Sequence, residues 1–133
     1  MKALLSPAEF VARALALPWV RWRSDWQACD CWGLVVLFFR EVRGIDLGPV
    51  PQVAIADGFA AARDWAECTR DAGAVAFMAF RDGAATHCGV LLPGDMLLHA
   101  EGDEVRGGRV KVTRLAAMQR LFPDLRFYRY SPC

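Results

Sequence analysis

The sequence lacks a long hydrophobic run and an excess of one charge. Its longest apolar stretch, counting Gly33, runs from Cys31 to Phe39, far short of the roughly 20 residues that span a bilayer. The 16 basic and 15 acidic residues give a formal net charge of +1, without a long block of like charge. We therefore expect no membrane span and no electrostatic footprint for nucleic acid.

Neither an export signal nor a disulfide framework is indicated. The apolar residues at the N-terminus are interrupted early by Ser6, Pro7 and Glu9, which a signal peptide would not tolerate. The five cysteines are an odd number, and in a chain without an export signal this favours reduced thiols. We expect a protein that is cytoplasmic as synthesised.

The 133 residues are 55% hydrophobic and 23% charged, which fits one domain over residues 1–133 with a single core. Three helices are expected in the first half. One begins at the capping pattern Ser6–Glu9 and runs to about Leu17. A second covers 31–43, and a third runs from Asp57 to about Thr69 before Gly73.

Strand patterns separated by turn residues follow from residue 74 onwards. The expected strands are 74–80, 86–92, 96–100, 104–106, 109–112 and 125–130, with a turn at Gly107-Gly108 and a short helix from Thr113. Helices first and strands later predict an α+β fold with an antiparallel sheet, in which the helix over 31–43 is central because it is apolar on nearly every side.

Cys31 lies in the first turn of that central helix. Asp30 is a good N-cap residue, and Gly44 is a natural stop. The unpaired N–H groups and the positive end of the helix dipole favour an anion at this position. A thiolate at Cys31 would therefore have a lowered pKa.

The only two histidines, His87 and His99, lie on neighbouring expected strands. If the loop between them has an odd number of residues, both side chains share one face of the sheet, and if it has an even number they lie on opposite faces. Cys88 alternates with His87, so we expect it to be a core residue outside the site. A thiol at a helix N-terminus with a histidine on a facing strand is the minimal arrangement of nucleophile and general base, and His99 could orient that base.

Four of the five tryptophans lie between residues 19 and 32. They either cover the core around the central helix or form one wall of a substrate cleft beside Cys31. Trp26 and Trp32 are the candidates for such a wall.

Three motifs together resemble the NlpC-type cell-wall peptidases, which are compact papain-like cysteine hydrolases. Asp30-Cys31-Trp32-Gly33-Leu34-Val35 is similar to the nucleophile motif Asp-Cys-x-Gly-aliphatic of that family. The strand His87-Cys88-Gly89-Val90 resembles its His-x-Gly-aliphatic strand, and Leu98-His99-Ala100 resembles the strand with the third polar residue. Gly73–Phe77 is similar to its strand leading into the sheet.

The resemblance implies a papain-like fold and a Cys-His-His triad. Cys31 would be the nucleophile, His87 the base and His99 the group that orients it, with the backbone N–H of Cys31 in the oxyanion hole. Asp30 would bind the free amine of a peptide or simply cap the helix. The implied substrate is the D-glutamyl to diamino-acid bond of peptidoglycan stem peptides, and no cofactor is expected.

One departure from the family pattern is Trp32, because many members have serine after the nucleophile. The form with tryptophan resembles the branch found in phage tails and gene-transfer particles, which suggests phage-tail proteins as partners. Other functions stay open: a zinc site formed by Cys29, Cys31, His87 and His99, a non-catalytic tail-assembly or wall-binding module, and acyl transfer by the same triad.

Overall fold

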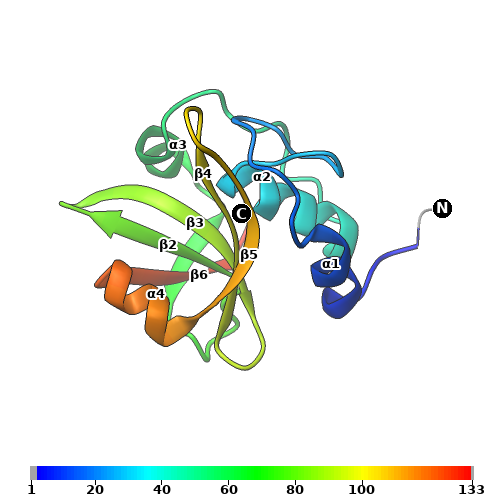
Figure 1. The fold of residues 1–133 in the computed structure, drawn as a ribbon. Helices are drawn as coiled ribbons and strands as arrows, with labels where there is room; N and C mark the ends of the chain where they lie inside the picture. Colours follow the sequence, from blue (N-terminus) through cyan, green and yellow to red (C-terminus); the bar gives the residue numbers. More distant parts are fainter. Residues whose placement is uncertain (1–2, 133) are drawn as a thin grey trace.

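The structure is a computed structural model that describes residues 3–132 and combines helices with one sheet (Figure 1). The helical elements are α1 (Pro7–Ala14), α2 (Cys31–Phe38), the π-helical turn η1 (Phe39–Arg43), α3 (Ile55–Ala61) and α4 (Leu115–Leu121). The strands are β1 (Trp65–Cys68), β2 (Ala76–Arg81), β3 (Ala84–Leu92), β4 (Met96–Asp103), β5 (Gly107–Arg114) and β6 (Asp124–Tyr130). They pair antiparallel in the order β1-β6-β2-β3-β4-β5. The predicted α+β class with an antiparallel sheet is confirmed.

The capping pattern at Ser6 starts α1 as predicted. The Ser6 hydroxyl accepts a hydrogen bond from the Glu9 N–H at 3.1 Å, and the Glu9 carboxylate accepts one from the Ser6 N–H at 2.9 Å. The helix ends at Ala14 instead of Leu17. The chain turns at Ala16, whose φ is +72° and whose N–H donates to the Val110 carbonyl of β5 at 3.2 Å.

The predicted central helix over 31–43 is observed, with α2 continuing directly into η1 and ending at Gly44, which has a φ of +67°. Every residue of α2 except Trp32 is buried. Gly33 allows the preceding loop to approach very closely, because a Cβ built at this position would lie 1.9 Å from the Arg23 carbonyl oxygen. The Ser24 hydroxyl also donates to the Gly33 carbonyl at 2.7 Å. Glycine at this position is therefore a packing requirement.

The expected helix from Asp57 to Thr69 is wrong in its second half. The chain forms only α3 and then the strand β1, which pairs with β6 so that Trp65 lies opposite Tyr130. The Trp65 ring packs on Tyr130 and Phe39, with ring centroids 5.3 and 5.4 Å apart. This long-range pairing outweighs the local helical pattern.

The expected strand over 104–106 is also wrong, because these residues form the turn between β4 and β5. The Asp103 carboxylate accepts hydrogen bonds from the N–H groups of Val105 and Arg106, at 2.9 and 2.7 Å. An aspartate that bonds the backbone two and three residues ahead ends a strand and starts a turn. β4 therefore runs through Asp103, and β5 begins at Gly107.

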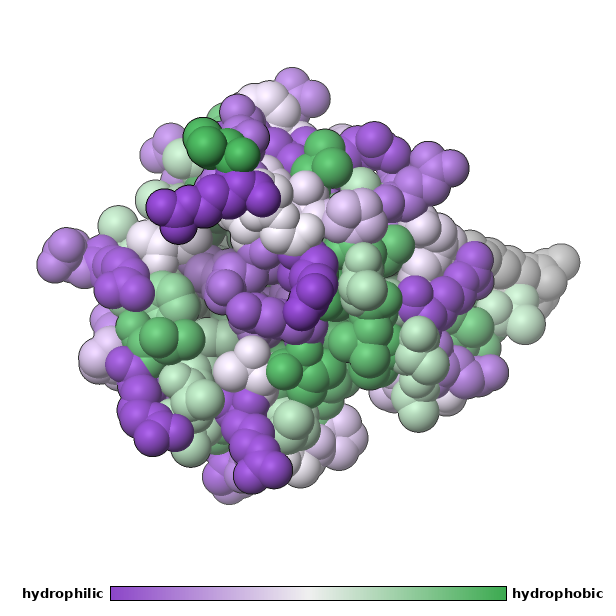
Figure 2. All heavy atoms as spheres, in the orientation of Figure 1, coloured by the Kyte–Doolittle hydropathy of each residue, from purple (hydrophilic) through white to green (hydrophobic). Residues whose placement is uncertain are grey.

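The two faces of the sheet are covered by different helices. A large apolar cluster joins α1 and α2 to one face, and a smaller one joins α4 to the other through Phe77, Leu97, Leu115 and Met118. Figure 1 shows α1 and α2 together on one side and α4 on the other. In the same orientation, Figure 2 shows hydrophilic and hydrophobic side chains interleaved over the visible surface.

No helix formed by residues 3–132 is long and apolar enough to cross a membrane.

Candidate active site

Cys31 is the first residue of α2 and lies, 8% exposed, in the lining of a cleft. The Asp30 carboxylate caps the helix by accepting a hydrogen bond from the Gly33 N–H at 2.7 Å. A hydrogen bond from the neighbouring Cys88 thiol and the adjacent His87 imidazole hold the pKa of Cys31 well below its usual range, although burial opposes this shift. Cys31 therefore has the surroundings of a reactive thiolate.

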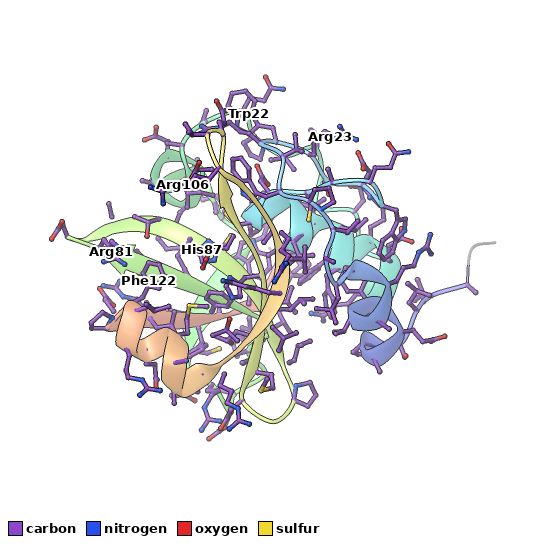
Figure 3. The ribbon with its side chains drawn as sticks, in the orientation of Figure 1. Trp22, Arg23, Arg81, His87, Arg106 and Phe122 are labelled. Atoms are coloured by element: carbon purple, nitrogen blue, oxygen red, sulfur yellow. The ribbon has the colours of Figure 1, made fainter. Side chains whose placement is uncertain are left out.

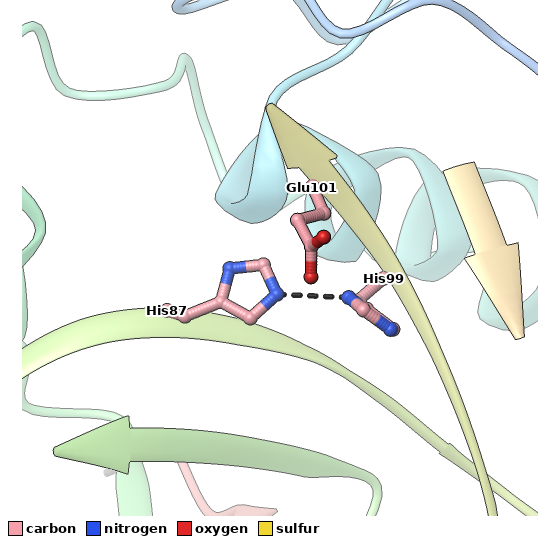
Figure 4. A group of neighbouring side chains, drawn as sticks. All are labelled: His87, His99 and Glu101. Atoms are coloured by element: carbon pink, nitrogen blue, oxygen red, sulfur yellow. Dashed lines mark hydrogen bonds between the residues drawn. The ribbon is translucent and has the colours of Figure 1, made fainter. Parts of the chain in front are cut away.

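The two histidines lie side by side, with His87 Nε2 2.9 Å from His99 Nδ1 (Figure 4). His99 is 1% exposed, and its other ring nitrogen, Nε2, lies 2.8 Å from the Thr113 hydroxyl. Burial, together with the charge of His87, lowers the pKa of His99 to about 3. His99 is therefore neutral at physiological pH and acts as a hydrogen-bonding group, whereas His87 keeps Nδ1 available for the thiol.

The histidines meet because β3 and β4 stop pairing next to them. The turn between the strands has three residues, so His87 and His99 share a face, as an odd loop requires. The ladder between β3 and β4 ends at Val90 and Leu98, and the two strands diverge beyond that point (Figure 4). A bulge in β3 at residue 86, immediately before His87, adds to this bend.

Gly89 makes the close contact of the histidines possible. A Cβ built on Gly89 would lie 2.4 Å from the Leu98 carbonyl oxygen and 2.9 Å from the Cβ of His99. Since no side chain lies between them, the His99 ring can reach diagonally across to His87. The glycine of the His-x-Gly pattern therefore has a steric role.

The cleft in front of these residues has a volume of about 930 Å³. Four tryptophans line it, from the loop before α2, from α2 itself and from β1, namely Trp19, Trp22, Trp32 and Trp65. Charged side chains of both signs also line it: Arg21, Arg63 and Arg81, with Asp57, Asp64 and Glu101. Such a cleft suits an extended ligand that carries apolar, acidic and basic groups.

Asp30 is 7% exposed, and both oxygens of its carboxylate bind the protein backbone. Oδ1 accepts the Gly33 N–H, and Oδ2 accepts the Trp22 N–H at 2.6 Å. Trp22 has a φ of +63°, which is unusual for a bulky residue. The structure thus gives Asp30 two structural tasks: it caps α2 and it holds Trp22 at the cleft wall.

Of the two expected wall residues, only Trp32 lines the cleft, with its ring edge-on to Trp65 at 5.7 Å. Trp26 lies elsewhere. Its ring packs on Phe10 at 5.3 Å, and its Nε1–H donates to the Glu41 carboxylate at 3.3 Å. The assignment of Trp26 to the substrate-binding wall is therefore wrong, because this ring closes the core between α1 and η1.

Four neighbours of the candidate site were not anticipated. The Cys88 thiol contacts Cys31, although the sequence placed it outside the site, and Thr113 contacts His99. Phe122 stacks on the His87 ring at 6.0 Å, and Arg81 lies over Phe122 at 4.5 Å. Figure 3 shows Arg81, His87 and Phe122 grouped beside β2 and β3. Of these four residues, only Cys88 had a signal in the sequence: strand alternation turns its side chain away from the face of His87, and that side faces α2.

Within residues 3–132, the one group of three potential metal ligands is His87, His99 and Glu101, whose donor atoms lie within 4.8 Å of one another. The facing nitrogens of the histidines are hydrogen-bonded to each other, and Glu101 binds Lys111 at 2.9 Å. The zinc alternative required Cys29 and Cys31 together with both histidines. The structure does not bring those four donors into one group.

The chain is similar to known proteins both in its fold and in its sequence profile. The structure is similar to the crystal structure of the NlpC/p60 domain of the peptidoglycan hydrolase SagA, with a TM-score of 0.59 and 23% sequence identity, over 92% of this chain and 98% of that chain. At this identity the likeness concerns the fold. No curated protein sequence matches the chain. A profile of the NlpC/P60 family matches residues 20–122, and since this is most of the chain, the protein belongs to the NlpC/P60 family.

Proposed function

We propose that the protein is a cysteine peptidase that hydrolyses peptidoglycan stem peptides at the D-glutamyl to diamino-acid bond. The observation that carries this proposal is that Cys31, at the N-terminus of α2 and with a lowered pKa, interacts with His87 in the lining of one cleft. Behind the cleft, His87 is paired with the buried His99. Membership of the NlpC/P60 family supports the choice of a cell-wall substrate.

In the first step, His87 accepts the thiol proton at Nδ1, and the Cys31 sulfur attacks the carbonyl carbon of the scissile bond. Negative charge then develops on the carbonyl oxygen. The backbone N–H of Cys31 belongs to the first turn of α2, where it needs no acceptor within the helix, and it stabilises this oxyanion. The dipole of α2 acts in the same direction.

In the second step, the His87 imidazolium donates its proton to the leaving amine, and a thioester to Cys31 remains. A water molecule, deprotonated by His87, attacks the thioester, which releases the acid and regenerates the thiol. His99 accepts a hydrogen bond from His87 Nε2–H throughout, so Nδ1 of His87 stays directed at the sulfur.

The cleft supports a stem-peptide substrate by its chemistry. A D-glutamyl to diamino-acid segment carries carboxylates and an amine, and the cleft offers arginines and carboxylates within an aromatic wall. Asp30 is a weaker candidate for the substrate amine than the exposed acids of the wall, because both of its oxygens already accept backbone hydrogen bonds.

The test is to incubate defined muropeptides with the protein and with Cys31→Ala, and to identify the products by mass spectrometry. We expect the native chain to release the diamino-acid fragment and Cys31→Ala to be inactive. Cys68→Ala, a change in β1 at a half-buried thiol, is the matched control and should cleave normally. If no stem peptide is cleaved in a Cys31-dependent way, the peptidase proposal fails. Binding without cleavage would favour the non-catalytic module.

A further inference from the structure

Thr113 lies on β5 behind the histidine pair, on the side away from Cys31. β5 pairs with β4 so that Thr113 is opposite Leu97 and diagonal to His99. Its hydroxyl oxygen lies 2.8 Å from His99 Nε2, and it continues the chain of contacts from His87 Nε2 to His99 Nδ1. The three side chains therefore form one hydrogen-bonded row across three neighbouring strands.

The direction of each hydrogen bond in this row follows from the number of protons. A neutral imidazole has one N–H donor and one acceptor nitrogen. For His87 to accept a proton at Nδ1, its own proton must be on Nε2, and His99 Nδ1 must then be the acceptor. The proton of His99 is consequently on Nε2, and the Thr113 oxygen must accept it.

The opposite arrangement would disable the base. If Thr113 donated to His99 Nε2, the His99 proton would be on Nδ1 and would point at His87 Nε2. His87 would then carry its proton on Nδ1, facing the sulfur, and could not accept the thiol proton. Whether His87 can accept the thiol proton therefore depends on whether the Thr113 hydroxyl accepts a hydrogen bond from His99 Nε2 or donates one to it.

We propose that Thr113 is a positioning residue of this site, which holds His99 in the Nε2-protonated form and thereby leaves His87 Nδ1 free to act as the base. This inference rests on the proposed peptidase function for its consequence on rate, but the protonation pattern that it predicts exists without substrate. His99 is almost completely buried, so water is a poor substitute for the hydroxyl.

The variants Thr113→Val and Thr113→Ser separate the hydroxyl from the shape of the side chain. Valine has nearly the same shape and no acceptor, whereas serine keeps the acceptor. We expect Thr113→Val to lower kcat/KM about tenfold, the effect of one lost hydrogen bond, and Thr113→Ser to stay within about threefold of the native value. Thr69→Val, at an exposed threonine beyond β1, is the matched control and should not change the rate.

The protonation pattern is measured directly by 15N NMR of histidine-labelled protein, which is simple to assign because the chain has only two histidines. In the native protein we expect His99 to be protonated at Nε2 and His87 to be protonated at Nε2 when neutral. In Thr113→Val, the His99 signals should shift toward the Nδ1-protonated form. If Thr113→Val does not fold, Thr113→Ala serves in its place.

Three results would overturn the inference: an unchanged histidine pattern in the valine variant, a changed pattern with full activity, or a serine variant as impaired as the valine variant. Should the peptidase proposal itself fail, the protein would cleave nothing, yet the NMR pattern would still decide whether Thr113 fixes the tautomer. The failures of the two proposals are therefore distinguishable.

Discussion

Three cysteines of this chain, Cys29, Cys31 and Cys88, are buried, yet their surroundings differ. Burial, followed by the nearby charge of Asp30, raises the pKa of Cys29 to about 12. The pKa of Cys88 is also raised, because its thiol donates a hydrogen bond to the Cys31 sulfur and because it is buried. Only Cys31 receives hydrogen bonds that stabilise its thiolate. The lowered pKa of Cys31 therefore comes from the groups around its sulfur and not from burial, which acts in the opposite direction.

We predict that iodoacetamide at about pH 6 alkylates Cys31 before the other four thiols. A lowered pKa means that the Cys31 thiolate persists at this pH and is lost only as the pH falls through the lowered value. Peptide mass spectrometry over a time course measures each rate, including that of Cys133, which lies outside the described residues.

Cys88→Ala removes the thiol that donates to Cys31, so alkylation of Cys31 should then require a higher pH, whereas Cys68→Ala should leave its pH dependence unchanged. Equal rates at all five cysteines of the native chain would show that Cys31 is an ordinary thiol.

At the scale of the elements, the sequence predicted the features that are set by residues close together in the chain. The caps at Ser6 and Asp30, the stop at Gly44 and the period of β3 and β4 are of this kind. β1 was not predictable in this way, because its four residues become a strand only by pairing with β6, about 60 positions later. Its apolar residues fit a helix equally well.

The residues of the candidate site also divide into those that local sequence patterns predict and those that depend on long-range contacts. Cys31 was identified from a helix start, and His87 and His99 from neighbouring strand patterns and the family resemblance, and the structure brings them together. Thr113 could not be found, because its contact with His99 depends on the register between β4 and β5. The position of Trp26 was also undetermined, since a tryptophan can pack on the core or face a cleft with the same local sequence.

The absence of a side chain at Gly89 lets β3 lie close to His99, and the variant Gly89→Ala tests this steric role. The added Cβ would collide with the Leu98 carbonyl and with His99, and the strands would have to move. We expect a loss of roughly 1–3 kcal/mol in the free energy of unfolding and a fall of at least tenfold in any Cys31-dependent cleavage.

Gly58→Ala in α3 is the matched control for stability. A Cβ there meets nothing closer than 3.7 Å, and alanine favours a helix. Denaturant unfolding of both variants gives the comparison. If Gly89→Ala were as stable and as active as the native chain, the steric role of Gly89 would be refuted.

At the scale of the whole molecule, the site lies where the two apolar clusters meet. Cys31 belongs to the cluster that joins α1 and α2 to one face of the sheet. The histidines contact Phe77, which belongs to the cluster under α4, with ring centroids 6.1 and 6.2 Å away. Cys31 and the histidine pair are therefore held by different parts of the core, and the contact between Cys31 and His87 depends on the complete fold.

The burial of His99 in the complete fold makes the free energy of unfolding depend on pH. In the folded chain its pKa is about 3, because of burial and the charge of His87, against 6.5 for an unperturbed histidine. Between pH 6.5 and 3 the unfolded chain therefore binds a proton at His99 that the folded chain does not, so the free energy of unfolding falls as the pH falls. The variant His99→Gln has no titratable group at this position, so its free energy of unfolding should fall less steeply with acidification. The slopes of the two proteins should differ by at most about 1.4 kcal/mol per pH unit. Urea unfolding of both proteins between pH 6 and pH 4 measures the two slopes, and identical slopes would mean that His99 titrates normally in the folded protein.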